Sequence, residues 1–201
     1  MSNSKKEKML KGRELITIGI FSAIYFVINF AFMLLSGLHP VLWILMPAFI
    51  ALFSGIPFML MCAKVQKPGA VLLMGLITGL IYFVTGQFTV VILVSFVIAC
   101  ALGEIARVIS KYSSFKGNAL AFILFSLGMV GSPLPIWLMR ESFIAQITEQ
   151  GMPESYISSL RAVSSFEMLI VMFVATIICA IIGALITKGM FKKHFKKAGI
   201  V

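Results

Sequence analysis

Long apolar stretches with almost no charge dominate this chain and constrain its fold more than any other feature. Six of them run over residues 15–36, 41–62, 69–85, 88–106, 118–138 and 166–187. A helix of about 20 apolar residues crosses the roughly 30 Å of bilayer hydrocarbon, and each stretch approaches or exceeds that length. The pattern predicts an all-α integral membrane protein, a bundle of six transmembrane helices that forms a single membrane domain over residues 1–201.

Composition agrees with this class. Only 12% of the residues are charged and 60% are hydrophobic, whereas soluble domains carry about 25% charged residues. The opening "MSNSKKEKMLKGR" before an apolar run has the look of a signal peptide. The run is too long for one and lacks an A-x-A cleavage site, so we interpret it as a retained first span.

The basic residues predict the orientation of the bundle. All but two of the 17 lie before the first span, in the second–third and fourth–fifth connections, or after the last span; Arg140 and Arg161 are the exceptions. By the positive-inside rule, the N- and C-termini are both cytoplasmic. The net charge of +10 therefore reflects topology and contact with the lipid bilayer, and no nucleic acid is needed to explain it.

The connection between the fifth and sixth spans, about residues 140–165, is a long outer loop. We expect two short amphipathic helices there, with an apolar face made of Ile144, Ile147, Tyr156, Ile157 and Leu160. A loop of this length is uncommon in a compact protein unless it has a role. Two interpretations stay open: a lid over a binding site, or a cap that covers the end of the bundle.

The fifth span ends in "GMVGSPLPIWLMR", residues 128–140. Two glycines and two prolines in so short a run predict a kink or an unwound segment in the outer third of that helix. Backbone groups freed there cannot face lipid, so they must face protein or a water-filled cavity. This favours an outward-facing pocket.

Several kinds of chemistry are missing from the sequence. It has no Asp, only two histidines, His39 and His194, and neither a phosphate-binding G-x-x-x-x-G-K-[ST] loop nor a G-x-S-x-G elbow. A catalytic metal site needs clustered His and carboxylate ligands. We therefore expect no enzyme activity, no cofactor and no metal, and we interpret the three cysteines as packing residues.

Acidic residues near the spans are few. Glu104 and Arg107 lie three residues apart toward the inner end of the fourth span, where they are expected to pair with each other; a proton relay is the alternative. Glu167 begins the sixth span. It is either a solvated charge at a helix start or an acid in the pocket.

Aromatic and polar side chains gather at the predicted outer ends of the spans, and an aromatic site with a few polar groups suits a small, flat, partly apolar ligand. Trp43, Tyr82 and Trp137 alternatively form an interfacial belt, and Gln87 and Arg140 are candidates for orienting hydrogen bonds. The full candidate set is Asn29, His39, Trp43, Tyr82, Gln87, Phe88, Trp137, Arg140, Glu141 and Glu167.

Small residues recur four apart on several spans. Gly19 and Ala23 do so in "GIFSA" of the first span, Gly75 and Gly79 in the third, and a similar stripe occupies residues 179–187 of the sixth. Such pairs let helix backbones approach closely in lipid. The partner is either another helix of this chain or a different subunit.

With these features the chain resembles the substrate-binding S components of energy-coupling factor (ECF) transporters: six spans in about 200 residues, both ends inside, and a small-x-x-x-small motif in the first span. The tail "IIGALITKGMFKKHFKKAGIV" resembles the end of the bacterial Trep_Strep family, which is assigned to the S components. S components commonly carry Ala at both small positions, and here the first is Gly19.

This resemblance implies a subunit of an ABC importer in the bacterial plasma membrane that captures a vitamin or similar micronutrient on its outer face. It implies docking through Gly19 and Ala23 on a membrane scaffold subunit coupled to two ATPase subunits. No substrate-contacting residue carries over from the family. The alternatives are a self-contained carrier or channel, which would need an ion-coupling group in the membrane, and a membrane enzyme or assembly factor.

Overall fold

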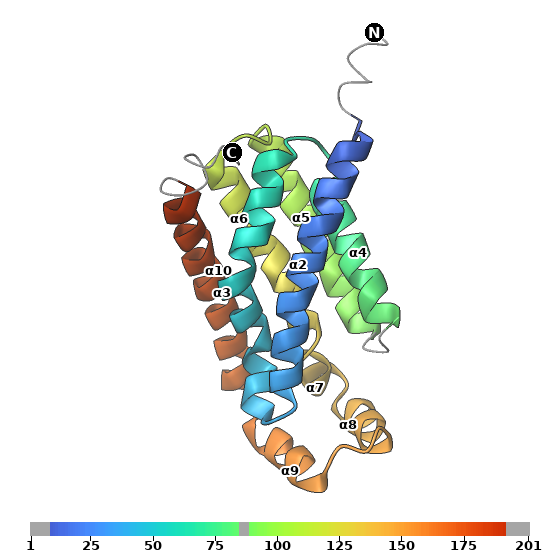
Figure 1. Ribbon diagram of the computed structural model, residues 1–201. Coiled ribbons are helices and arrows are strands. Elements are labelled where there is room, and N and C mark those ends of the chain that lie inside the picture. The colour runs from blue at the N-terminus through green and yellow to red at the C-terminus, as the bar shows by residue number, and fades with distance from the viewer. Residues whose placement is uncertain (1–8, 85–88, 192–201) are drawn as a thin grey trace.

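The structure is a computed structural model that describes residues 9–84 and 89–191, and these residues form an all-helical bundle without strands (Figure 1). Gln87 and Phe88 lie outside the described residues, as does the "KHFKKAGI" run of the tail. The helices are α2 (Gly12–Ser36), α3 (Pro40–Lys64), α4 (Ala70–Val84), α5 (Val90–Ile109), α6 (Phe115–Ser126), the 3-10 helix η1 (Leu127–Gly131), α7 (Pro135–Leu138), α8 (Arg140–Glu149), α9 (Glu154–Val163) and α10 (Phe166–Met190).

Four of these helices, α2, α3, α5 and α10, are long and apolar enough to cross a membrane. Two shorter apolar helices, Ala70–Val84 and Phe115–Gly131, accompany them. The prediction of an all-α membrane bundle is confirmed at this level. The count of six crossings stays a prediction, because α4 has only 15 residues and rises about 22 Å.

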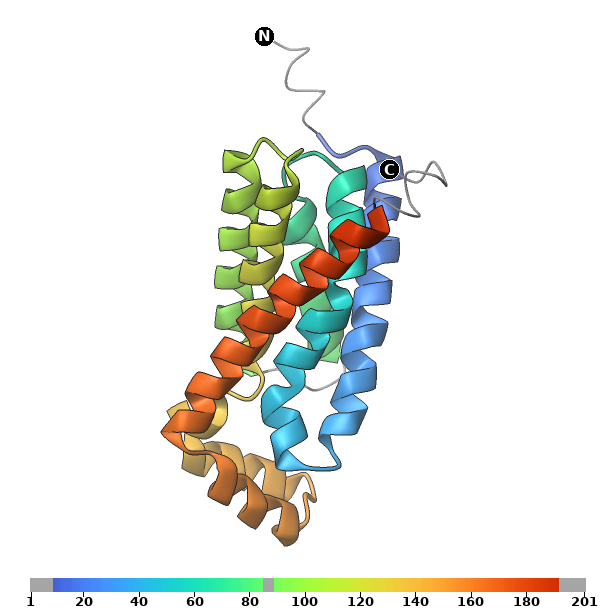
Figure 2. The same ribbon diagram turned by 90° about the vertical axis from the view of Figure 1, so that its left-hand side faces the viewer.

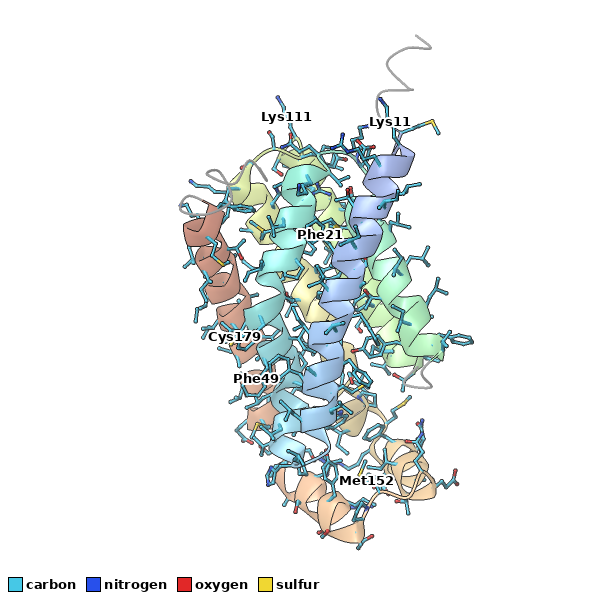
Figure 3. The ribbon with its side chains drawn as sticks, in the orientation of Figure 1. Lys11, Phe21, Phe49, Lys111, Met152 and Cys179 are labelled. Atoms are coloured by element: carbon cyan, nitrogen blue, oxygen red, sulfur yellow. The ribbon has the colours of Figure 1, made fainter. Side chains whose placement is uncertain are left out.

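The bundle has two chemically different ends. Its first described helix begins and its last ends on the same side (Figures 1 and 2). Lys11 and Lys111 lie at that end, whereas Met152 lies at the opposite end with α8 and α9 (Figure 3). This arrangement agrees with the segregation of basic residues along the sequence. Which end faces the cytoplasm stays a prediction.

Helix α3 is the centre of the bundle, and α10 crosses it obliquely (Figure 2). The two backbones touch: a Cβ atom added to Gly55 would lie 2.7 Å from the carbonyl carbon and oxygen of Gly183, and one added to Gly183 would lie 2.7 Å from the Ala51 and Leu52 oxygens. The small-residue stripe of the sixth span is therefore an internal packing surface.

An aromatic cluster joins four helices around Phe125 of α6. Its ring centroid lies 5.0 Å from that of Phe58, 5.3 Å from that of Tyr25 and 5.4 Å from that of Phe96. The pairs with Tyr25 and Phe96 are edge-on and the pair with Phe58 is tilted; aromatic pairs at such distances contribute about 0.5–1.5 kcal/mol each beyond their buried area. The cluster therefore ties α2, α3 and α5 to α6 through one side chain.

The predicted interruption of the fifth span is confirmed. The α-helix of α6 tightens into η1 at Leu127, turns at Ser132–Leu134 and resumes briefly as α7. The Ser95 hydroxyl of α5 donates a hydrogen bond of 3.0 Å to the Gly128 oxygen. The neighbouring helix thus satisfies a carbonyl of the unwound segment, as the interior of a membrane requires.

The prediction that Glu104 and Arg107 pair with each other is wrong. Among the described residues no ion pair joins them, and the Glu104 carboxylate instead accepts hydrogen bonds from the backbone N–H groups of Gly69 at 2.8 Å and Val71 at 3.1 Å. These N–H groups open α4. Glu104 therefore caps the positive end of that helix from a neighbouring one.

Arg107 performs the complementary task at the end of α3. Its fully buried guanidinium donates to the Val65 oxygen at 2.6 Å and to the Cys62 oxygen at 3.4 Å, and to Oδ1 of Asn118 at 3.2 Å. Carbonyls at a helix end lack partners within their own helix. Two residues of α5 thus satisfy both sides of the α3–α4 connection.

The α3–α10 contact predicts opposite effects for two glycines of the same helix. Gly183→Ala should lower the free energy of unfolding by about 1–3 kcal/mol, because the new methyl group collides with the backbone of α3. Gly189→Ala is the control, since a Cβ there meets nothing within 4 Å; it should leave stability unchanged or raise it by up to about 1 kcal/mol. Thermal unfolding in detergent measures both, and equal effects would contradict the proposed contact.

Candidate ligand-binding site

A cavity of about 370 Å³ lies at the end of the bundle formed with α8 and α9, beneath those two helices. Helices α2, α3 and α4, the N-cap of α5 and the turn after η1 supply the rest of its wall. It is lined by Met33, Leu34, Ser36, Gly37, Trp43, Met46, Tyr82, Thr89, Ser132, Phe143, Gln146, Ile147, Gln150, Met152, Tyr156 and Leu160.

The polarity of the lining changes across the cavity. The α8–α9 side contributes the amides of Gln146 and Gln150 and the hydroxyl of Tyr156, while α2 and α3 contribute Met33 and Met46. An amide carries both donors and an acceptor, whereas the thioether of Met is a weak acceptor at best. The α8–α9 side therefore offers two amides, whereas the bundle side is mostly apolar, with hydroxyl groups from Ser36, Thr89 and Ser132.

Helices α8 and α9 confirm the two short amphipathic helices predicted for the third outer connection. Ile144, Ile147, Ile157 and Leu160 are all buried and belong to one apolar cluster with the adjoining ends of α3 and α10. Gly151, with a φ of +85°, makes the turn between the two helices, a conformation that favours glycine. This packing places the polar side of α8 over the cavity.

Two contacts attach the α8–α9 pair to the far side of the cavity. The rings of Phe143 and Trp43 stack with centroids 5.3 Å apart and planes 8° apart. The Tyr156 hydroxyl donates a hydrogen bond of 3.1 Å to the Ser36 oxygen at the end of α2. Burial raises the pKa of Tyr156 to about 12, so the phenol is a neutral donor at physiological pH.

The structure brings together three of the predicted site residues. Trp43 and Tyr82 line the cavity. Asn29 lies behind Tyr82, fully buried, where its Oδ1 accepts from the Tyr82 hydroxyl at 3.3 Å and its amide donates to the Tyr25 oxygen at 2.7 Å. Asn29 therefore orients a wall residue rather than facing the cavity.

His39 has a different task at the same end of the bundle. Its Nδ1 accepts a hydrogen bond of 3.2 Å from the backbone N–H of Val41, so His39 is the N-cap of α3. A side chain that satisfies one of the free N–H groups of a first turn stabilises the helix by about 1 kcal/mol. His39 is absent from the cavity lining.

Trp137 and Arg140 also lie outside the cavity lining. The Trp137 indole donates to the Ser165 oxygen at 2.9 Å, and Arg140 donates to the Ser164 oxygen at 2.8 Å and to the Ile136 oxygen at 3.4 Å. Both side chains thus fix the junction between α7 and the start of α10. These hydrogen bonds serve the fold, and the orienting role predicted for Arg140 stays a prediction.

Glu141 and Glu167 are exposed. Glu141 lies 3.6 Å from Arg161 in a solvent-exposed ion pair, which contributes little to stability. Glu167 occupies the first turn of α10, where a negative charge is favourable. The geometry favours the helix-start interpretation of Glu167 over a pocket acid.

Sequence reasoning missed several residues of the site. Phe143 and Gln146 line the cavity from α8, and Gln150 does so from the C-cap of that helix. Their spacing of three and four residues places them on one side of the helix. That spacing was a usable signal. Ser36, Thr89 and Ser132 carry no pattern that separates them from ordinary helix-end residues.

The small-residue stripe of α2 is a second candidate surface, away from the cavity. A Cβ added to Gly19 would meet nothing within 4 Å, and Ala23 is exposed. Large apolar neighbours beside it are exposed as well, Ile20 to 55% and Val27 to 65%. Within residues 9–84 and 89–191, the other helices leave this face of α2 open.

Comparison with known proteins places the chain in a family. The sequence model of a family described as "Hypothetical bacterial integral membrane protein (Trep_Strep)" matches residues 12–197. The chain therefore belongs to the Trep_Strep family, as its tail suggested, and is a bacterial multi-pass membrane protein. No curated protein and no solved structure matches it.

The attachment of α9 to α2 predicts a measurable titration. The pKa of Tyr156, near 10 when unfolded and about 12 when folded, means that the folded protein holds this proton more tightly. The stability gained from it is fully present below pH 10 and is lost as the pH rises through about 12. The tyrosinate absorbance of the protein minus that of Tyr156→Phe should titrate near 12, and a difference that titrates near 10 would contradict the buried contact.

Proposed function

We propose that the chain is the substrate-binding S component of an ECF importer. In this proposal the α8–α9 end faces outward, both termini are cytoplasmic, and α4 and the α6–η1 segment complete six crossings. The support is geometric: the cavity lies at the end of the bundle opposite Lys11 and Lys111 (Figure 3). The positive-inside rule puts that basic end in the cytoplasm.

The cavity beneath α8 and α9 is the observation that carries the proposal. Its volume of about 370 Å³ falls within the range of small-molecule sites, about 300–1,000 Å³. The stacked Trp43 and Phe143 rings supply an aromatic surface, and Gln146 and Gln150 supply donors and acceptors. A vitamin or similar micronutrient with a ring and a few polar groups suits such a lining.

The open stripe on α2 supports docking on a second membrane subunit. Without a hydrophobic force between helices in lipid, association depends on close backbone contact, which Gly19 and Ala23 permit. The sequence has no phosphate-binding loop of its own. In the proposal a scaffold subunit binds this face and two ATPase subunits supply the energy for release of the ligand inward.

The alternative, a self-contained carrier or channel, has less support. Such a protein needs an ionisable group that is free to bind and release a coupling ion within the membrane. In the described part of the chain the buried charged side chains are Glu104 and Arg107, and both are committed to helix ends. We therefore favour a passive binding subunit that does not transform its ligand.

Gly19→Leu tests the docking face. The larger side chain should prevent close approach of the scaffold, so co-purification of the scaffold and ATPases and uptake by cells should both be lost. Thermal stability and the amount of small molecule retained on the purified protein in native mass spectrometry should stay unchanged. The control is Gly189→Leu, which also adds a side chain in open space; if Gly19→Leu reduces retention as much as uptake, the stripe serves this chain's own structure.

The double substitution Gln146→Ala and Gln150→Ala tests the cavity. Each lost hydrogen bond to a ligand costs about 0.5–1.5 kcal/mol, so together they should reduce ligand affinity roughly tenfold. Dilution of the purified protein followed by native mass spectrometry measures retention. Glu149→Ala on the same helix, outside the lining, should have no effect, and equal retention in all three proteins would exclude this cavity as the capture site.

A further inference from the structure

A second hollow of about 330 Å³ lies on the side of the bundle between α4 and α5, which run next to each other (Figure 1). Its lining is apolar apart from one phenol and one thiol. It consists of Leu72, Gly75, Leu76, Gly79, Leu80, Tyr82, Phe83, Ile92, Leu93, Phe96, Val97 and Cys100. We call it the α4–α5 groove.

Tyr82 belongs to the lining of both hollows. Its hydroxyl is bonded to Asn29, so the ring carbons are the surface that it offers to the hollows. The ring stands edge-on to Phe26, with planes at 85° and centroids 6.4 Å apart. Tyr82 is therefore a fixed wall residue that the outer cavity and the groove share.

The groove is open because of a glycine on α4. A Cβ added to Gly79 would meet nothing within 4 Å, and the side chains at the rim face outward: Leu80 is 55% exposed and Val97 is 59% exposed. In a membrane this surface contacts lipid chains. The groove therefore has the chemistry and the position to hold an acyl or isoprenoid chain.

The short length of α4 places Tyr82 within the bilayer. Tyr82 lies about 18 Å along the helix from Ala70, at 1.5 Å per residue, while the hydrocarbon region is about 30 Å thick. Phe83 and Val84 beyond it are exposed to 63% and 82%. Tyr82 is thus at the depth of acyl chains when α4 begins at the inner interface.

The two hollows that share Tyr82 differ in polarity. The outer cavity has the amides of Gln146 and Gln150 and the hydroxyls of Ser36, Thr89 and Ser132, whereas the α4–α5 groove is apolar apart from Tyr82 and Cys100. A soluble, uniformly polar ligand matches the outer cavity alone. A molecule with one polar end and one apolar chain matches both hollows.

We propose that the ligand of the outer cavity is amphipathic, with its polar end held under α8 and α9 and a single apolar chain that runs past Tyr82 into the α4–α5 groove. This inference rests on the proposed function of the outer cavity as a capture site, and it names the class of substrate. The proposed occupant has a single chain, and a two-chain phospholipid is the alternative that the experiment distinguishes.

Photo-crosslinking in phosphatidylcholine vesicles tests the proposal with the full chain. One probe is palmitic acid with a diazirine in mid-chain, and the other is phosphatidylcholine that carries the same photoreactive chain. Palmitic acid should label Leu80, Leu93 and Val97 roughly tenfold more than the exposed Val27 of α2 and Ile178 of α10, the ratio given by about two further buried methylenes. The phospholipid should label all these positions alike.

Gly79→Leu should fill the groove and remove the excess labelling by palmitic acid, whereas Gly189→Leu should preserve it. In a Trp137→Phe background Trp43 is the remaining tryptophan, and its fluorescence should change when palmitic acid is added, but not after Gly79→Leu. Equal labelling by both probes would overturn the proposal, as would groove labelling without a response from Trp43.

The two proposals fail separately. If no scaffold subunit co-purifies with the unaltered chain, the S-component assignment is contradicted and the crosslinking result still stands. Uniform crosslinking would contradict the amphipathic ligand and would leave docking through α2 intact.

Discussion

The direct backbone contact between α3 and α10 at Gly55 and Gly183 is the constraint on which the rest of the bundle depends. Lipid chains are as apolar as leucine, so helices in a membrane gain little from burying apolar side chains and depend on close packing. By crossing at two glycines, α10 lies directly on α3. The central helix is then free to pack its other sides against α2 and α6, and the α8–α9 pair is held between α7 and α10.

The second constraint is that two buried charged residues, Glu104 and Arg107, hydrogen-bond to backbone groups at helix ends. Glu104 and Arg107 bind the two free helix ends of the α3–α4 connection, which a water-poor interior would otherwise leave unsatisfied at a cost of several kcal/mol per group. These hydrogen bonds stabilise the short connection between α3 and α4. They also commit both side chains to helix ends, which supports the proposal of a binding subunit over that of an ion-coupled carrier.

Much of the fold could be predicted from the sequence because membrane helices obey simple length and composition rules. The break before Pro133 and the amphipathic faces around Ile144 and Ile157 followed from local chemistry. The stripes at Gly19 and Gly183 look alike in sequence, and only tertiary packing separates the open one from the internal one. The prediction of the site was incomplete for the same reason. Trp137 and Arg140 lie at the outer end of the bundle, as predicted, but they hydrogen-bond to the residues before α10. Gln146 and Gln150 reach the cavity because α8 and α9 fold back over it.

Helix α2 contributes to both the outer cavity and the proposed docking face. Its last turns contribute Met33, Leu34 and Ser36 to the cavity, and its open face carries Gly19 and Ala23 about three turns earlier. The Ser36 oxygen also accepts the hydrogen bond that attaches α9 through Tyr156. In the proposed function, a ligand in the cavity contacts the last turns of α2, and the scaffold subunit would dock on the open face of the same helix. The proposal therefore places ligand and scaffold on one rigid element, through which binding of one would affect binding of the other.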